Sequence, residues 1–115
     1  MKENNIKNKS IKFAIRIVNL YKFLKDEKQE YIMSKQLMRS GTSIGANVSE
    51  AERAVSKKDF SNKLSIALKE ASESEYWIDI LYKTNYLEHE QSESLKNDVI
   101  EIIKILIAII KKSNT

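Results

Sequence analysis

The chain has no proline and only two glycines, Gly41 and Gly45, in 115 residues. These two residue types end helices and shape tight hairpins, so their scarcity favours long helices. A sheet-rich fold needs repeated turn signals, and the sequence contains no Asn-Gly, Asp-Gly or Pro-Gly pair. The length suits one domain, residues 1–115, built around a single core.

Four segments repeat their apolar residues every three or four positions, which is the spacing of one helix face. The predicted helices cover about residues 10–25, 31–54, 57–84 and 91–112. Asp26 to Glu30 is a polar connection, and Ser56 with Asp59 forms the pattern of a capping box. Four helices with short links predict an all-α, antiparallel up-down-up-down four-helix bundle. We expect the polar ends, residues 1–9 and 113–115, to be disordered.

The composition argues against several kinds of site. The absence of cysteine excludes disulfides and thiolate chemistry, and His89 is the single histidine. Two glycines and no Gly-Lys pair leave no phosphate-cradling loop. We therefore expect no metal, no cofactor and no enzymatic activity.

The sequence also predicts a cytoplasmic protein with no membrane partner. Its amino terminus is polar and lysine-rich, without the apolar stretch that a signal peptide needs. Its most apolar segment, residues 99–110, is well short of the roughly 20 residues that span a bilayer.

Polar residues form a stripe on the second predicted helix, beside its apolar seam. At the helical repeat they fall within an arc of about 80°, and they are Gln36, Arg39, Ser43, Asn47 and Glu50. The stripe has two interpretations: a buried hydrogen-bond network that fixes the helix register, or a functional site. A lesser alternative is a helix broken at residues 40–45, because its two glycines disfavour helix.

A matching stripe on the third predicted helix contains Glu70, Glu73 and Trp77. If the second and third helices pack antiparallel, Arg39 should pair with Glu73 or Glu70. Two carboxylates raise the possibility of acid–base catalysis, but no nucleophile with an adjacent histidine or lysine accompanies them.

Charge is unevenly distributed along the chain. Residues 1–69 hold 15 Lys or Arg and 7 Asp or Glu, whereas residues 70–115 hold 5 and 9. On the first predicted helix, Lys9, Lys12 and Arg16 project from one side. This side is either a solvated face or a phosphate-binding surface.

The fourth predicted helix is apolar around most of its circumference. Between residues 102 and 110 only Lys104 is polar, although a helix in a monomeric bundle needs an apolar stripe of only about 100°. We therefore expect another copy of the chain to cover this helix. The sequence does not decide which of Ile102, Ile105, Ile107 and Ile109 face outward.

The motifs together resemble a known family. The segment QLMRSGTSIGANVSEA (residues 36–51), followed by SKKDF (56–60) and ALKEASESEYW (67–77), is similar to bacterial four-helix bundle proteins associated with ribosomal RNA intervening sequences. The resemblance implies an antiparallel bundle, a homopentameric ring, a role in binding nucleic acid and no enzymatic activity. That family is similar in fold to the accessory protein of diversity-generating retroelements, which is thought to contact RNA.

Two functional hypotheses follow from these patterns. The first is a non-enzymatic oligomeric bundle that binds RNA or another nucleic acid through basic surfaces on its first helix. The alternative is a protein–protein assembly or adaptor module with no role in nucleic-acid binding.

Overall fold

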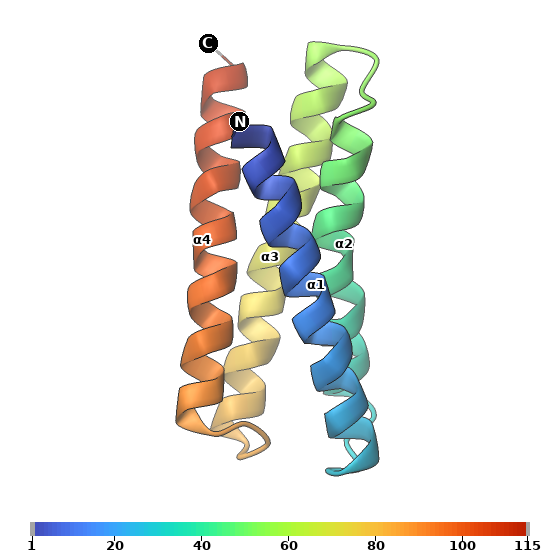
Figure 1. Ribbon diagram of the computed structural model, residues 1–115, viewed down its shortest axis with the longest axis vertical. Helices are drawn as coiled ribbons and strands as arrows, with labels where there is room; N and C mark the ends of the chain where they lie inside the picture. Colours follow the sequence, from blue (N-terminus) through green and yellow to red (C-terminus); the bar gives the residue numbers. More distant parts are fainter. Residues whose placement is uncertain (1, 115) are drawn as a thin grey trace.

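The computed structural model describes residues 2–114, with side chains from residue 5 onward, as a four-helix bundle (Figure 1). Helix α1 spans Lys2–Asp26, α2 Met33–Ala51, α3 Lys57–Lys83 and α4 His89–Ser113. The molecule measures 45 × 21 × 19 Å. Over the described part of the chain there is no strand, which confirms the all-α prediction.

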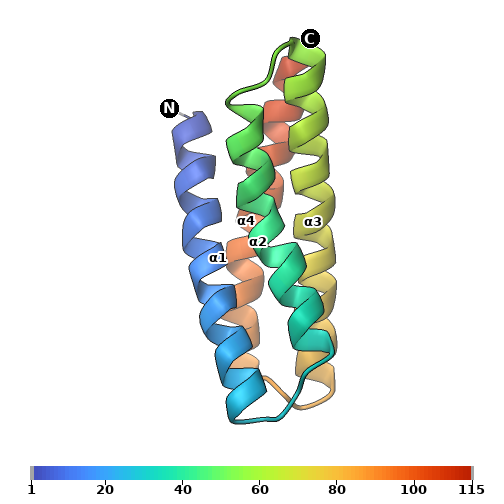
Figure 2. The ribbon, with the colours of Figure 1, turned by 90° about the vertical axis from the view of Figure 1, so that its right-hand side faces the viewer.

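Consecutive helices run in opposite directions. The start of α1, the α2–α3 link and the end of α4 lie at one end of the bundle, and the other two links lie at the opposite end (Figures 1 and 2). The packed pairs are α1 with α2, α2 with α3, α3 with α4, and α1 with α4, the last being the loosest. This arrangement agrees with the predicted up-down-up-down topology. Within residues 2–114, no helix combines the length and apolar character that crossing a membrane requires.

The amino-terminal segment differs from the prediction. Helix α1 begins at Lys2, so residues 2–9 are helical rather than disordered, while Met1 lies outside the described residues. Ile6 explains the extension, because it lies seven residues before Phe13 on the same face and is only 1% exposed. At the other end, Ser113 closes α4, and Thr115 again lies outside the described residues.

The connection between α1 and α2 contains a buried carboxylate that the sequence analysis missed. Glu30 is 7% exposed, and its carboxylate accepts hydrogen bonds from the backbone N–H groups of Ile32, Met33 and Ser34 at 2.7–3.1 Å. These are N–H groups that the first turn of a helix leaves without partners. Glu30 therefore caps α2, which begins at Met33 rather than at residue 31.

The other two links follow local sequence signals more closely. Ser56 accepts a hydrogen bond from the Asp59 N–H at 3.0 Å, as a capping box requires, and the Asp59 carboxylate accepts from the N–H of Val55. Helix α2 ends at Ala51, three residues before the predicted boundary. After α3, Asn85 adopts a left-handed conformation (φ 70°) and ends that helix.

The core consists of one apolar stripe from each helix. Its largest fully buried side chains include Phe13, Ile17, Leu37, Ile44, Leu64, Ile78, Ile102 and Leu106. Gly41 lets α1 approach α2 closely, because a Cβ at that position would lie 2.8 Å from Cγ1 of Ile17. The missing side chain at Gly41 is therefore what lets α1 pack closely against α2.

Candidate functional site

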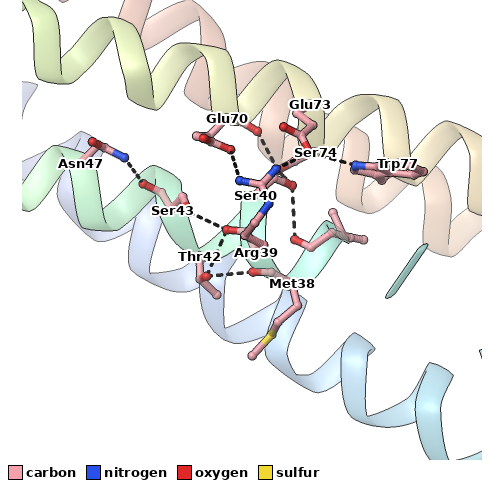
Figure 3. A network of polar contacts seen from close by, with 11 residues as sticks. Met38, Arg39, Ser40, Thr42, Ser43, Asn47, Glu70, Glu73, Ser74 and Trp77 are labelled. Carbon is pink, nitrogen blue, oxygen red and sulfur yellow. Dashed lines mark hydrogen bonds and ion pairs between the residues drawn. The ribbon is translucent and has the colours of Figure 1, made fainter. Parts of the chain in front are cut away.

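Arg39 links α2 to α3 in the middle of the polar stripe (Figure 3). One guanidinium nitrogen lies 3.2 Å from Oε1 of Glu70, and the other contacts Oε2 of Glu73. The same Glu73 oxygen accepts a hydrogen bond from the indole N–H of Trp77 at 3.1 Å. The predicted pairing of Arg39 with these acids is confirmed for both.

The ion pair shifts the ionisation of its members. Hydrogen bonding to Arg39, followed by that to Trp77, holds the pKa of Glu73 below its ordinary value despite partial desolvation. The hydrogen bond to Glu73 correspondingly raises the pKa of Arg39. Glu73 is therefore a poor general acid near neutral pH, and the arrangement suits holding two helices in register better than proton transfer.

The stripe is not a buried network, which was one of its two interpretations. The Arg39 side chain is 50% exposed, and Gln36 and Glu50 are exposed. Ser43 donates to the backbone carbonyl of Arg39, and Asn47 donates to that of Ser43, so both bond within α2 (Figure 3). Ser43 and Asn47 therefore satisfy their hydrogen-bonding groups within their own helix and need no partner on α3.

Only two members of the stripe reach α3. Besides Arg39, Glu50 lies 2.9 Å from Nζ of Lys63. Gln36 makes no side-chain hydrogen bond to any residue that the structure describes. The stripe therefore divides into two surface ion-pair groups rather than one connected site.

A buried polar contact that the sequence analysis missed lies beside the polar stripe. Ser40 and Ser74 are both fully buried, and their hydroxyl oxygens are 2.9 Å apart (Figure 3). Each serine occupies an apolar-seam position: Ser40 follows Leu37 by three residues, and Ser74 precedes Ile78 by four. A small polar residue at a core position was the available signal.

The predicted basic face of α1 is largely neutralised by α4. Lys9 lies 3.1 Å from Glu101, and Arg16 lies 2.6 Å from Asp98. Lys12 is exposed and forms no ion pair within the described residues. The acids escaped the sequence analysis because they are more than 80 positions away and belong to the acidic half of the chain.

An apolar groove lies on the outer side of the α1–α2 seam. It encloses about 360 Å³ and is lined by small side chains such as Ala14, Gly45 and Ala46. Ile11 and Ile15 of α1 also line it and remain 46% and 56% exposed. Exposed isoleucines beside a hollow are typical of a surface that another protein covers.

Helix α4 is less exposed than the sequence suggested. Among its four candidate isoleucines, Ile102 and Ile109 face the core, Ile105 is half-buried, and Ile107 is 45% exposed.

Within the described residues no three His, Cys, Asp or Glu side chains gather in a way that could hold a metal ion.

Comparisons with known proteins identify the family and support the fold. A solved structure of a protein of unknown function from the S23 ribosomal protein family of Bacteroides thetaiotaomicron is 62% identical to this chain, with a TM-score of 0.96. The match covers 96% of this chain and 99% of that one. A search of curated proteins gave no match. The family model for 23S rRNA-intervening sequence proteins matches residues 2–108, and the chain therefore belongs to that family.

Proposed function

We propose that the protein is a non-enzymatic helical bundle that associates with further copies of itself and binds RNA through phosphate contacts. The observation that carries the RNA proposal is membership of a family named for the 23S rRNA intervening sequence. The formal net charge of +4 supports it, because cations that neutralise phosphates supply most of the sequence-independent affinity for nucleic acid.

A salt titration tests RNA binding. Labelled RNA, as a hairpin and as a single strand, is titrated with the protein at about 50 mM salt and at several higher concentrations. Binding should weaken steeply with salt, with the slope of log affinity against log salt changing by about 0.7 for each phosphate contacted on a single strand. Absence of binding to either RNA at the lowest salt concentration would contradict the proposal.

Self-association is supported by the α1–α2 groove, whose occupant we propose to be a second copy of the chain. The groove presents Ile11 and Ile15 on one face of the molecule, and α4 exposes Ile107 on another. Contact between unlike faces of identical chains closes into a ring when the rotation between neighbours permits it. Such a contact would cover both sets of isoleucines.

Sedimentation of substituted proteins tests this interface. Ile15→Glu and Ile107→Glu should each yield monomers that keep their helical circular dichroism, because a charge on either face opposes burial. Ile66→Glu is the matched control, since Ile66 is 42% exposed on α3 and does not line the groove. Monomeric wild-type protein at micromolar concentration, or an Ile15→Glu variant that assembles normally, would contradict the proposed interface.

The second candidate function is a protein adaptor, and the same groove favours it. A helix from a different protein can fill an apolar hollow between two helices as well as a copy of this chain can. A protein that remains monomeric, binds no RNA and retains a specific protein partner through Ile15 would favour this alternative.

A further inference from the structure

The charge of the folded molecule is polarised along its long axis. The segments that gather at the end formed by the α2–α3 link are residues 5–9, 45–63 and 107–114, which we call the basic end (Figure 1). They hold eight Lys or Arg and three Asp or Glu, a net charge of +5. The segments at the opposite end, residues 20–35 and 79–95, carry a net charge of −2.

All three acids of the basic end are already engaged. Glu52 pairs with Lys7 at 3.1 Å, and Glu50 pairs with Lys63 at 2.9 Å. Asp59 accepts the backbone N–H of Val55 at 3.3 Å. Two of the three acids are therefore paired with Lys7 and Lys63, and this end keeps a surplus of cations.

Three lysines represent this surplus. Lys57, Lys58 and Lys111 are exposed and form no ion pair with any residue that the structure describes. On the predicted α1 face, by contrast, Lys9 and Arg16 are paired with acids of α4. A phosphate that approaches Lys57, Lys58 or Lys111 breaks no ion pair of these lysines within the described residues, so no such loss offsets its attraction.

A polar groove lies beside Lys57 and Lys58, where the start of α3 and the end of α4 run side by side (Figure 2). It encloses about 650 Å³ and is lined by Lys57, Lys58, Ser61, Asn62, Ser113 and Asn114, among others. Ser61 donates a hydrogen bond to Oδ1 of Asn114 at 3.2 Å across it. The lining supplies ammonium, hydroxyl and amide groups, which are the donors that phosphate and ribose oxygens accept.

The same end has no exposed aromatic ring for stacking bases, and its one exposed guanidinium is that of Arg53. Its only aromatic residue is Phe60, which is half-buried and packed against the core. Recognition of single-stranded RNA relies on unstacked bases resting on aromatic or guanidinium planes, whereas double-helical RNA is recognised through its backbone and 2′-hydroxyls. The chemistry of the groove therefore suits the backbone of an RNA helix.

We propose that the basic end, and not the α1 face, is the RNA-binding surface, with the backbone of double-helical RNA seated in the groove between the start of α3 and the end of α4. This assignment rests on the proposed RNA-binding function. The position of charges along the sequence indicated neither this surface nor the form of RNA.

The test compares two triple variants of equal charge. The first, Lys57→Gln with Lys58→Gln and Lys111→Gln, removes three cations from the basic end. The control, Lys22→Gln with Lys35→Gln and Lys83→Gln, removes three exposed lysines near the opposite end of a molecule 45 Å long. The Debye length at 0.1 M salt is about 10 Å, so charges that far away contribute little at the basic end. The probes are an RNA hairpin and a single strand with the same number of phosphates.

The proposal predicts that the basic-end variant binds the hairpin at least tenfold more weakly at about 100 mM salt, with a salt slope flatter by about 2 to 3 units. The control variant should bind within about threefold of wild type, and wild type should prefer the hairpin to the single strand. Circular dichroism confirms that both variants fold.

The two proposals fail in different ways. If wild type binds neither RNA, the proposed function is wrong. If wild type binds but the two variants lose affinity equally, or the basic-end variant binds normally, RNA binding stands and the basic end is the wrong surface. A clear preference of wild type for the single strand would overturn the assignment to double-helical RNA.

Discussion

Helix α2 meets its two neighbours in opposite ways. Against α1 it presents Gly41, and the missing side chain lets Ile17 approach its backbone. Against α3 it presents Arg39, which reaches across to Glu70 and Glu73. The first contact is apolar and buried, while the second is charged and half-exposed.

The charged residues at the α3 contact are easy to notice in the sequence, but the packing at Gly41 should contribute more to stability. Half-exposed ion pairs contribute about 0–1 kcal/mol, because water solvates the separated charges nearly as well. A close-packed seam cannot accept even one extra methyl group without moving its neighbours. Stability should therefore be more sensitive to Gly41 than to the ion pair.

The largest effect is expected at Gly41. Gly41→Val should lower the free energy of unfolding by about 2–3 kcal/mol, because its Cβ would lie within 3.2 Å of three Ile17 atoms, including Ile17 Cβ, which cannot move away without its backbone. Denaturant unfolding followed by circular dichroism measures the change. Adding Ile17→Ala should recover part of the loss by making room.

Gly45 provides the matched control on the same helix. A Cβ there would meet Ser10 Cβ at 3.4 Å, an ordinary contact, so Gly45→Ala should raise the free energy of unfolding by up to about 1 kcal/mol through helix propensity. Equal effects of valine at 41 and alanine at 45 would show that the α1–α2 seam is not tightly packed.

An intermediate effect is expected at Glu30, which lies in the link between α1 and α2 and caps the start of α2. Glu30→Ala should cost about 1–2 kcal/mol, because the first N–H groups of α2 lose their acceptor in a buried place. Desolvation raises the pKa of Glu30, but hydrogen bonds from Met33, Ser34 and Ile32 outweigh it and leave the pKa below its ordinary value.

The pH dependence follows from that direction. Because the folded-state pKa is lowered, the stabilisation by ionised Glu30 is fully present above the ordinary glutamate pKa of about 4.3 and is lost as the pH falls through the folded-state value. Glu30→Gln should be less stable than wild type at pH 7 and should show a smaller loss of stability between pH 5 and pH 3, roughly the range in which glutamates titrate. Urea unfolding measures these stabilities. If Glu30→Gln loses as much stability as wild type between pH 5 and pH 3, Glu30 does not have this role.

The smallest effect is expected at the α3 contact. Arg39→Gln should lower the free energy of unfolding by at most about 1 kcal/mol, and less at high salt. It should also raise the pKa of Glu73 toward its ordinary value, because Arg39 is the main cause of its depression. Carboxyl NMR titration measures that pKa, and a loss of 3 kcal/mol or more on substitution would mean that the pair behaves as a buried one.

Several elements of this fold could be predicted because their causes are local. Apolar residues at helical spacing gave the four helices, and Ser56 with Asp59 placed the start of α3 to the residue. The pairing of Arg39 with Glu70 and Glu73 was also predictable, since a short link between antiparallel helices sets which residues of α2 and α3 lie opposite each other.

Other features escaped because their partners lie far along the chain. The cations Lys9 and Arg16 look free until α4 brings Glu101 and Asp98 beside them. Glu30 is a different case: its partners lie only two to four residues away, but glutamate is not among the residues that usually cap a helix. Burial was misjudged for the polar stripe because periodicity gives a direction around a helix but not the depth of water beside it.

The sequence by itself determined the secondary structure, the helix order and the antiparallel topology, because periodicity, caps and short links act over a few residues. Only the tertiary structure decided which charges remain unpaired and where they gather. The reason is physical: electrostatic attraction depends on distance in space, and folding brings three basic segments together at one end of the bundle while α4 neutralises most of the basic face of α1.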